Sequence, residues 1–370
     1  MTRVLLAPDG FKGSISAAAA AAALAAGWRA VRPGDAIVEL PVADGGEGTL
    51  DAFVVAVPGA RRMPVTVTGP HGHEVVASWV LLPATADAPH GTAVVELAST
   101  SGIELLAGDL RPFDADTRGF GQAIAAALDQ GVSRLVLAIG SSASTDAGFG
   151  LLTALGARIV DAEGHDVPPG LRGVRTAVRL ERQGLRALPA GGALVLTDVR
   201  SPLTGPGGAA AVFGPQKGLG AEDIPAADAA LARAADLLAT DAAFPGTGAA
   251  GGTGAALRAW GAELVPGAER IADLLGLVEA VAAADVVVTG EGSFDASSAT
   301  GKAPARVAAL ARAEGRRVGL VAGRIAPDAD TSRFGAAVAL VQLAGSTEAA
   351  LAEPARWLTA AGEALAEHLG

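Results

Sequence analysis

The strongest constraint on the fold is a repeated pairing of short apolar runs with alanine-rich segments of helical spacing. Residues 3–7 and 285–289 are such runs, and each leads through a Gly-containing loop into a helical segment, 16–26 and 304–314 respectively. Continuous apolar runs are typical of strands buried on both faces. The alternation therefore predicts an α/β fold with a parallel sheet and helices on both of its faces.

Both chain ends continue this pattern. Ser16 is expected to cap the first helix, and Gly27 is expected to end it. The remaining predicted elements of the two ends are strands 37–41, 317–322 and 336–342 and helices 49–55 and 354–368.

The middle of the chain has a different pattern. Residues 64–68 and 74–82 flank the sequence GPHGH, which predicts a β-hairpin, and further strands are expected at 92–97, 134–139 and 193–197. This change predicts a discontinuous domain made from both chain ends, with a mixed α+β domain inserted between boundaries near residues 63 and 284.

Composition narrows the class of protein. The chain has 370 residues, of which 50% are hydrophobic and 18% charged, as expected of a globular protein long enough for two domains. Its net charge of −11 argues against a nucleic-acid partner. It has no cysteine, which excludes disulfides and thiolate metal sites. The most apolar stretch, 15–28, is mostly alanine and falls short of the roughly 20 apolar residues of a membrane span. Since the N-terminus also lacks a signal-peptide pattern, the protein is expected to be cytoplasmic.

Five loops at the ends of apolar strands combine glycine or serine with acidic residues or lysine. Ligands of open α/β sheets bind at the carboxyl ends of strands, where small residues let backbone N–H groups approach phosphate oxygens. The five loops are 8–14, 44–49, 140–148, 198–218 and 290–302.

The first two loops could bind a metal and a phosphate. Asp9 and Lys12 could hold a metal-bridged phosphate and an anion, although a solvated turn would have the same composition. Asp44 precedes Gly45 and Gly46 at a predicted helix start, where carboxylates could hold Mg²⁺. Helix capping by Asp44, with an acid three residues later, is an equal alternative.

The next two loops could bind an anion and supply a base. The segment beginning at Gly140 carries four hydroxyls, including Ser141, Ser142 and Ser144, and would cradle an anion unless it is only a polar turn. Asp198 follows a strand and could orient an attacking hydroxyl, or it could merely cap a turn. The following sequence also includes Lys217, between turn residues.

The fifth loop is the hardest to explain by packing, because Gly290 and Gly292 surround Glu291 and the loop continues to Asp295 and Lys302. Acids and lysines on glycine-rich strand ends favour phosphoryl transfer, which needs positioning, metal and positive charge. The sequence contains no GxxxxGK[ST] motif and no complete dinucleotide fingerprint. The residues alone therefore predict a phosphotransferase without a P-loop.

In this order the loops resemble the bacterial glycerate kinase family of the glycerate 2-kinase type. The resemblance covers nearly the whole chain, and its most specific strings are PVADGGEGT, AAVFGPQKG and TGEGSFD followed by GK. It implies a flavodoxin- or Rossmann-like domain at 1–63 and 284–370, an inserted domain at 64–283, and an active site in the cleft. Family members often have glycine where this chain has Ser141 and Ala147, and asparagine at Ser201, which puts the substrate preference in doubt.

The resemblance implies transfer of the ATP γ-phosphate to the 2-hydroxyl of D-glycerate. We expect Mg²⁺ at Asp44 and Glu291, with Asp9 as an outer or alternative ligand. We expect Asp198, with Asp295 in reserve, to accept the hydroxyl proton. The cations expected to neutralise the phosphate and the glycerate carboxylate are Lys12, Lys217 and Lys302.

Other functions stay open on the sequence. They are a kinase acting on the 3-hydroxyl or on a related hydroxy acid, a phosphatase that uses the same acids, and a regulator that binds a metabolite without catalysis. The sequence also leaves homo-oligomerisation undecided.

Overall fold

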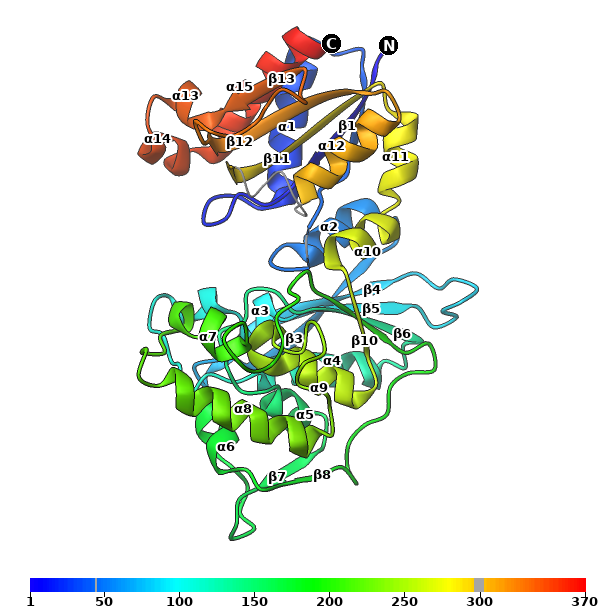
Figure 1. Cartoon of the computed structure of the whole chain (residues 1–370). Helices are drawn as coiled ribbons and strands as arrows, with labels where there is room; N and C mark the ends of the chain where they lie inside the picture. The colour runs from blue at the N-terminus through cyan, green and yellow to red at the C-terminus, as the bar shows by residue number, and fades with distance from the viewer. Residues whose placement is uncertain (44, 296–302) are drawn as a thin grey trace. The chain divides into compact units, whose positions relative to one another are not determined.

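The computed structural model describes residues 1–43, 45–295 and 303–370, which form two compact units (Figure 1). Unit 1 comprises residues 1–44, 51–58 and 268–370, and unit 2 comprises 45–50 and 59–267. These contact-based divisions near 58 and 268 differ from the expected domain boundaries near 63 and 284, which remain a prediction. Among the described helices, none has both the length and the apolar character of a membrane span.

Unit 1 is built on a five-stranded, fully parallel sheet in the order β13-β12-β11-β1-β2. This is the flavodoxin-like order, and it joins the two chain ends through the pairing of β1 with β11. The predicted α/β fold class is thereby confirmed. The strands are β1 (Arg3–Pro8), β2 (Ala36–Glu39), β11 (Val286–Phe294), β12 (Arg317–Ile325) and β13 (Ala336–Ala339).

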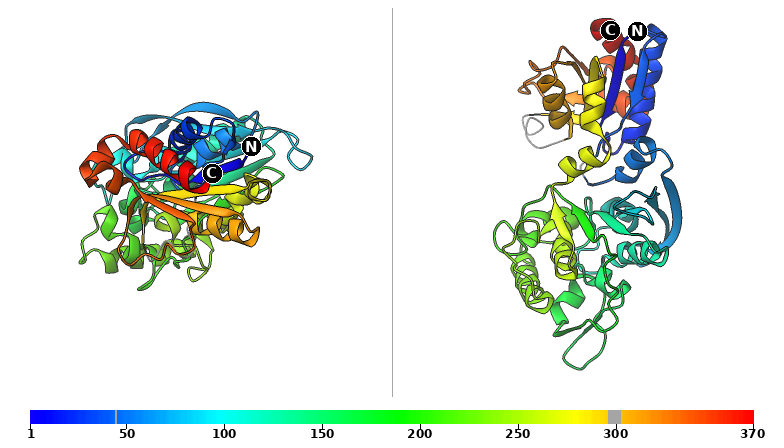
Figure 2. Two further views of the ribbon diagram at one scale, coloured as in Figure 1. Left: turned by 90° about the horizontal axis from the view of Figure 1, so that it is seen from above. Right: turned by 90° about the vertical axis from the view of Figure 1, so that its right-hand side faces the viewer.

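Helices cover both faces of this sheet, with α1 and α15 on one face and α11 and α12 on the other (Figure 2). The helices that include residues of unit 1 are α1 (Ala17–Val31), α2 (Thr49–Ala56), α10 (Gly267–Leu274), α11 (Leu277–Ala283), α12 (Ala303–Ala313), α13 (Leu340–Ala344), α14 (Thr347–Ala352) and α15 (Pro354–Leu369).

The first helix begins as expected but does not end where expected. The Ser16 hydroxyl accepts a hydrogen bond from the backbone N–H of Ala19 at 3.2 Å, so Ser16 is the N-cap. The prediction that Gly27 ends the helix is wrong, because α1 continues to Val31. A side chain at Gly27 would overlap the carbonyl oxygen of Thr359 in α15. Glycine is therefore required here by the close approach of two helices.

The strand after residue 285 is longer than expected, so the first residues of the predicted fifth loop belong to a strand. β11 continues to Phe294, and Gly290 pairs with Val321 of β12. Gly290 and Gly292 therefore lie within a strand. A Cβ atom at Gly290 would overlap the Val321 carbonyl oxygen, so the glycine allows the two strands to approach closely. The predicted strand 336–342 is shorter than expected, because α13 begins at Leu340.

Unit 2 contains a mixed six-stranded sheet in the order β10-β9-β6-β5-β4-β3. β3 and β4 pair antiparallel and confirm the predicted hairpin, while β5, β6, β9 and β10 run parallel. The strands are β3 (Arg61–Thr68), β4 (Glu74–Leu82), β5 (Thr92–Glu96), β6 (Arg134–Ala138), β9 (Ala193–Leu196) and β10 (Glu263–Val265), with a separate ribbon of β7 (Arg158–Val160) and β8 (Arg179–Glu181).

One hydrophobic core lies in unit 2, where α4 packs through Phe120 and Ile124 against buried residues of the sheet such as Leu135 and Leu137. The α-helices are α3 (Ala98–Ser101), α4 (Arg118–Asp129), α5 (Phe149–Ala154), α6 (Gly170–Thr176), α7 (Ala209–Phe213), α8 (Ile224–Leu238) and α9 (Thr253–Trp260). The 3-10 helices are η1 (Ile103–Leu106), η2 (Pro215–Lys217) and η3 (Ala249–Gly252).

Candidate active site

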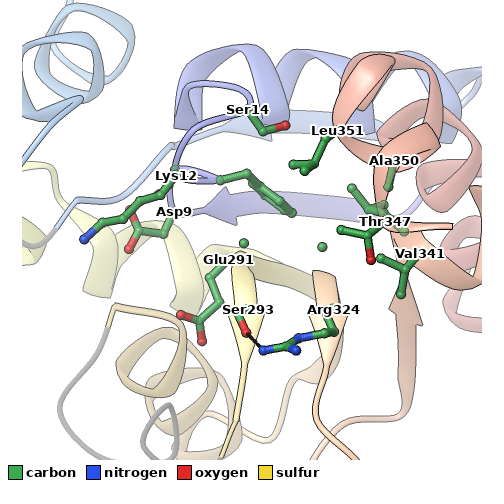
Figure 3. A pocket seen from close by; sticks show the side chains of 15 residues that line it. Asp9, Lys12, Ser14, Glu291, Ser293, Arg324, Val341, Thr347, Ala350 and Leu351 are labelled. Carbon is green, nitrogen blue, oxygen red and sulfur yellow. Dashed lines mark hydrogen bonds between the residues drawn. The ribbon is translucent and has the colours of Figure 1, made fainter. Parts of the chain in front are cut away.

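A pocket of about 420 Å³ lies in unit 1 at the carboxyl ends of β1 and β11 (Figure 3). The chain leaves β1 in one direction to form β2 and returns on the other side to form β11. Open parallel sheets bind ligands at such a switch point. The topology of unit 1 therefore marks this pocket as a candidate site.

Four predicted site residues line this pocket together, the charged Asp9, Lys12 and Glu291 and the backbone of Gly292. Asp9 follows β1 directly, Lys12 lies in the same loop, and Glu291 is in β11. Figure 3 shows their charged ends on the same side of the pocket. The backbone N–H of Asp9 donates to the Gly290 carbonyl at 2.8 Å, which holds the loop against β11. The structure thus brings the first and fifth predicted loops together.

In unit 2, the predicted glycines lie across the ends of two strands. The backbone N–H of Gly140, just after β6, donates to the Gly45 carbonyl at 2.9 Å. A Cβ atom at Gly140 would lie 2.5 Å from the Gly46 Cα, and one at Gly45 would lie 3.0 Å from the Leu196 carbonyl oxygen. Close backbone packing accounts for these glycines. Their predicted role in phosphate binding stays a prediction.

The same region contains a buried acid that the sequence reasoning missed. Glu96 ends β5 and accepts a hydrogen bond from the backbone N–H of Leu50 at 3.2 Å. Burial raises the pKa of Glu96 from 4.5 to about 7, and the nearby charge of Glu47 acts in the same direction. Glu96 ends β5 after the apolar residues Ala93, Val94 and Val95, and an acid at the carboxyl end of such a run is the sequence signal for it.

Lys217 joins the third and fourth predicted loops. Its Nζ donates to the Ser142 hydroxyl at 2.7 Å and to the Ser144 carbonyl at 2.6 Å. The side chain is buried, and burial lowers the pKa of its ammonium from 10.5 to about 7, while the charge of Asp146 opposes this. Lys217 therefore holds the hydroxyl-rich loop from within the protein.

Asp146 organises this loop, a role that the sequence reasoning did not assign. Its carboxylate accepts five hydrogen bonds, from the N–H and hydroxyl of Thr117, the hydroxyl of Ser144, and the N–H groups of Gly148 and Gly150. The side chain is fully buried. Asp146 follows the hydroxyl run directly, and an acid in that position next to glycines is the sequence signal for its role.

Asp116 is a second buried acid near Asp146 that the sequence reasoning missed. Burial, together with the charge of Asp146, raises the pKa of Asp116 from 3.8 to about 6. The backbone N–H of Arg118 donates to Asp116 at 3.0 Å. Asp116, Asp146 and Lys217 thus place two acids and one cation in the interior around one loop.

The two departures from the family's glycines occupy strained backbone positions. Ser141 has φ of 60° and Ala147 has φ of 53°. This left-handed region costs a non-glycine residue roughly 1–2 kcal/mol. The Ser141 carbonyl accepts a hydrogen bond from the N–H of Ile103 at 2.9 Å, which helps to hold the conformation. At these two positions the loop therefore has the left-handed backbone conformation that favours glycine, although neither residue is glycine.

The two predicted base residues are in different units. Asp198 is in unit 2, where its Oδ1 accepts the backbone N–H of Gly267, the first residue of α10, at 2.9 Å. Asp295 is in unit 1 and follows β11 directly. Asp44 and Lys302 lie outside the described residues. Within 1–43, 45–295 and 303–370, no group of three or more acids and histidines is arranged to hold a metal ion.

Comparisons with known proteins agree with this architecture. The model of the Glycerate kinase family matches residues 4–370. The chain is 39% identical over 334 residues to the Glycerate 2-kinase of Escherichia coli K12, covering 88% of this chain and 86% of that protein. It is 39% identical over 336 residues to the Glycerate kinase of Bacillus subtilis 168, covering 89% of this chain and 86% of that protein.

A solved structure leads to the same family. The crystal structure of a candidate glycerate kinase 2 from Salmonella typhimurium LT2 matches with a TM-score of 0.82 and 37% identity, covering 99% of this chain and 97% of that one. The family match and the curated relatives extend over most of the chain. The chain belongs to the glycerate kinase family and is a kinase.

Proposed function

We propose that this kinase transfers the γ-phosphate of ATP to the 2-hydroxyl of D-glycerate and so produces 2-phosphoglycerate. The observation that carries the proposal is the 39% identity, over 88% of the chain, to a protein named Glycerate 2-kinase. The charged pocket of unit 1 supports it, because phosphoryl transfer depends on positioning, cations and metal around the migrating group.

Asp9 and Glu291 fit a Mg²⁺ site by their chemistry. Both carboxylates line the same side of one pocket. Mg²⁺ in nucleotide sites is usually held by one or two protein carboxylates, with waters and substrate phosphates as its other ligands. Bound there, the ion would neutralise charge on the phosphates. Asp44 remains a proposed additional ligand.

The lysines and the loop of unit 2 have separate proposed roles. Lys12 would stabilise negative charge on the transferred phosphoryl group. The Gly140–Ser144 loop, held by Lys217, would present the hydroxyls of Ser141 and Ser142 and N–H groups to an anion such as the glycerate carboxylate. The hydroxyl of Ser144 already donates to Asp146. Lys302 is a further proposed phosphate ligand. The base that takes the proton of the substrate hydroxyl is proposed to be Asp198, with Asp295 as the alternative.

The test is an ADP-release assay with the full chain, ATP and Mg²⁺, offering D-glycerate, L-glycerate or lactate. We expect ADP release that requires D-glycerate and Mg²⁺, and ³¹P NMR should identify 2-phosphoglycerate. A 3-phosphoglycerate product would overturn the regiochemistry. Glycerate binding without ADP release would favour a non-catalytic regulator and would contradict the proposal.

A further inference from the structure

We propose that the pocket of unit 1 binds ATP in one orientation, with the triphosphate beside Asp9, Lys12 and Glu291 and the nucleoside against an apolar wall formed at α13 and α14. This inference rests on the proposed use of ATP.

The lining of the pocket is chemically divided. The charged side chains of Asp9, Lys12 and Glu291 end on one side, whereas Val341 and Thr347 lie on the other (Figure 3). The remaining charged residue of the lining, Arg324, extends its guanidinium toward the hydroxyl of Ser293. The apolar residues of the lining are Phe11, Leu340, Val341, Ala350 and Leu351. A ligand that uses the whole pocket must carry a charged end and a sizeable apolar body.

This division separates the two substrates of the proposed reaction. Glycerate has a hydroxyl or carboxylate on each of its three carbons, so it has no apolar body to place against five apolar side chains. A nucleotide has a flat aromatic base at one end and a polyphosphate at the other. The cavity of about 420 Å³ also lies within the size range typical of small-molecule and cofactor sites. The lining therefore favours the nucleotide.

The floor of the pocket supports the same occupant. Gly292 of β11 and Gly323 of β12 both line the cavity, and a Cβ atom at Gly323 would overlap the Gly292 carbonyl oxygen. Because these neighbouring positions carry no side chain, the strands present bare backbone to the ligand. Backbone groups and a nearby polar side chain, that of Thr347, are available to the ribose or the base edge.

The experiment changes the apolar wall without touching the charged side. Leu351 lines the pocket and is 54% exposed, so Leu351→Asp should fold. We expect it to weaken binding of mant-ATP, measured by fluorescence without glycerate, by about tenfold or more, since an introduced charge disfavours an apolar ring. The KM for ATP should rise by a similar factor, and the KM for glycerate should not change.

Leu343→Asp is the matched control. Leu343 is 38% exposed on α13 and is not part of the pocket lining, so this change should leave mant-ATP binding as in the wild type. Should Leu351→Asp lower the Tm strongly, Thr347→Trp provides a second test by filling the pocket from an exposed position. We expect this variant to lose ATP binding as well.

The outcomes separate this inference from the proposed function. Wild-type glycerate phosphorylation with unchanged ATP affinity in Leu351→Asp and Thr347→Trp would overturn the nucleotide assignment alone. A rise in the KM for glycerate in place of that for ATP would assign the pocket to the other substrate and also overturn it. If the wild type forms no product, the proposed function fails, and the mant-ATP titrations still decide the pocket.

Discussion

Lys217 and Ser142 are 75 residues apart in the chain, yet the Lys217 ammonium donates to the Ser142 hydroxyl at 2.7 Å inside unit 2. Two segments that look like independent polar turns in the sequence are thereby held as one structure. The lysine is buried, and burying a cation costs desolvation free energy. An apolar side chain would fill the same space without this cost. Its presence favours a role in function.

Lys217→Met should separate function from stability. In the folded protein the pKa of Lys217 is lowered to about 7, so the folded state binds fewer protons than the unfolded state between about pH 7 and 10.5. This residue therefore makes wild-type stability rise with pH across that window. We expect the Tm of the Met variant, relative to the wild type, to be higher at pH 6.5 than at pH 9.5. We expect kcat to fall by about 100-fold or more. A variant with wild-type kcat would show that Lys217 is only structural.

Asp198→Asn tests the proposed base. Asparagine keeps an oxygen that can accept the Gly267 N–H, so the fold should be preserved. We expect kcat to fall by about 10²–10⁴-fold, which is the usual contribution of a general base. Retention of more than about a tenth of kcat would transfer the role to another acid. Asp241→Asn, a change at a surface residue that also accepts a backbone N–H, should leave kcat unchanged.

Gly27→Ala should destabilise the packing of α1 against α15. The added methyl group would overlap the Thr359 carbonyl, and backbone cannot move aside without separating the helices. We expect the free energy of unfolding to fall by about 1–3 kcal/mol or more, as measured by urea denaturation. Gly34→Ala is the control, because a Cβ atom at Gly34 meets no atom within 4 Å. Equal effects of the two changes would contradict the helix packing described.

Ala239→Gly should stabilise unit 2. Ala239 follows α8 with φ of 52°, a conformation that glycine adopts without the steric cost paid by alanine. We expect a gain of about 0.5–1 kcal/mol in the free energy of unfolding. The same substitution at Ala229, an exposed interior position of α8, should instead cost about 1 kcal/mol. Effects of the same sign at both positions would show that the helix does not end as described.

Glu96→Gln should change how stability depends on pH. Because the pKa of Glu96 is raised from 4.5 to about 7 in the folded protein, the folded state binds more protons than the unfolded state in that window. Wild-type stability should therefore fall as pH rises from about 4.5 to 7. The Gln variant lacks this loss. Its free energy of unfolding, relative to that of the wild type, should therefore increase between pH 4.5 and pH 8 by at most about 3 kcal/mol, since each tenfold change in proton affinity is worth about 1.4 kcal/mol.

Thermal unfolding at pH 4.5, 6 and 8 measures this difference. The charged groups that act on Glu96 are Glu47, which raises its pKa, and Arg62, which lowers it. Glu367→Gln, a change at an exposed glutamate of α15, should show little dependence on pH and serves as the control. An advantage for Glu96→Gln that shrinks as pH rises would contradict the prediction.

Local patterns were sufficient for most of the elements. Apolar runs located strands such as β1 and β6, and Ser16 marked the start of α1, because strand burial and helix capping depend on a few neighbouring residues. The glycine-rich loop compositions also identified candidates such as Lys12 and Glu291, which share a pocket in unit 1. These features are local, so they can be read along the chain.

Other features depend on segments that are distant in the sequence. Gly27 looks like a helix terminator until α15 is packed against it, and Gly290 looks like a loop residue until β12 lies beside it. The burial that shifts the pKa of Glu96 and the two hydrogen bonds that Thr117 donates to Asp146 likewise come from distant parts of the chain. Steric exclusion and desolvation are set by whatever surrounds an atom in space. For this reason, residue type and spacing indicated the elements and many candidate residues, whereas only the folded arrangement decided which glycines are contacts and which charges are buried.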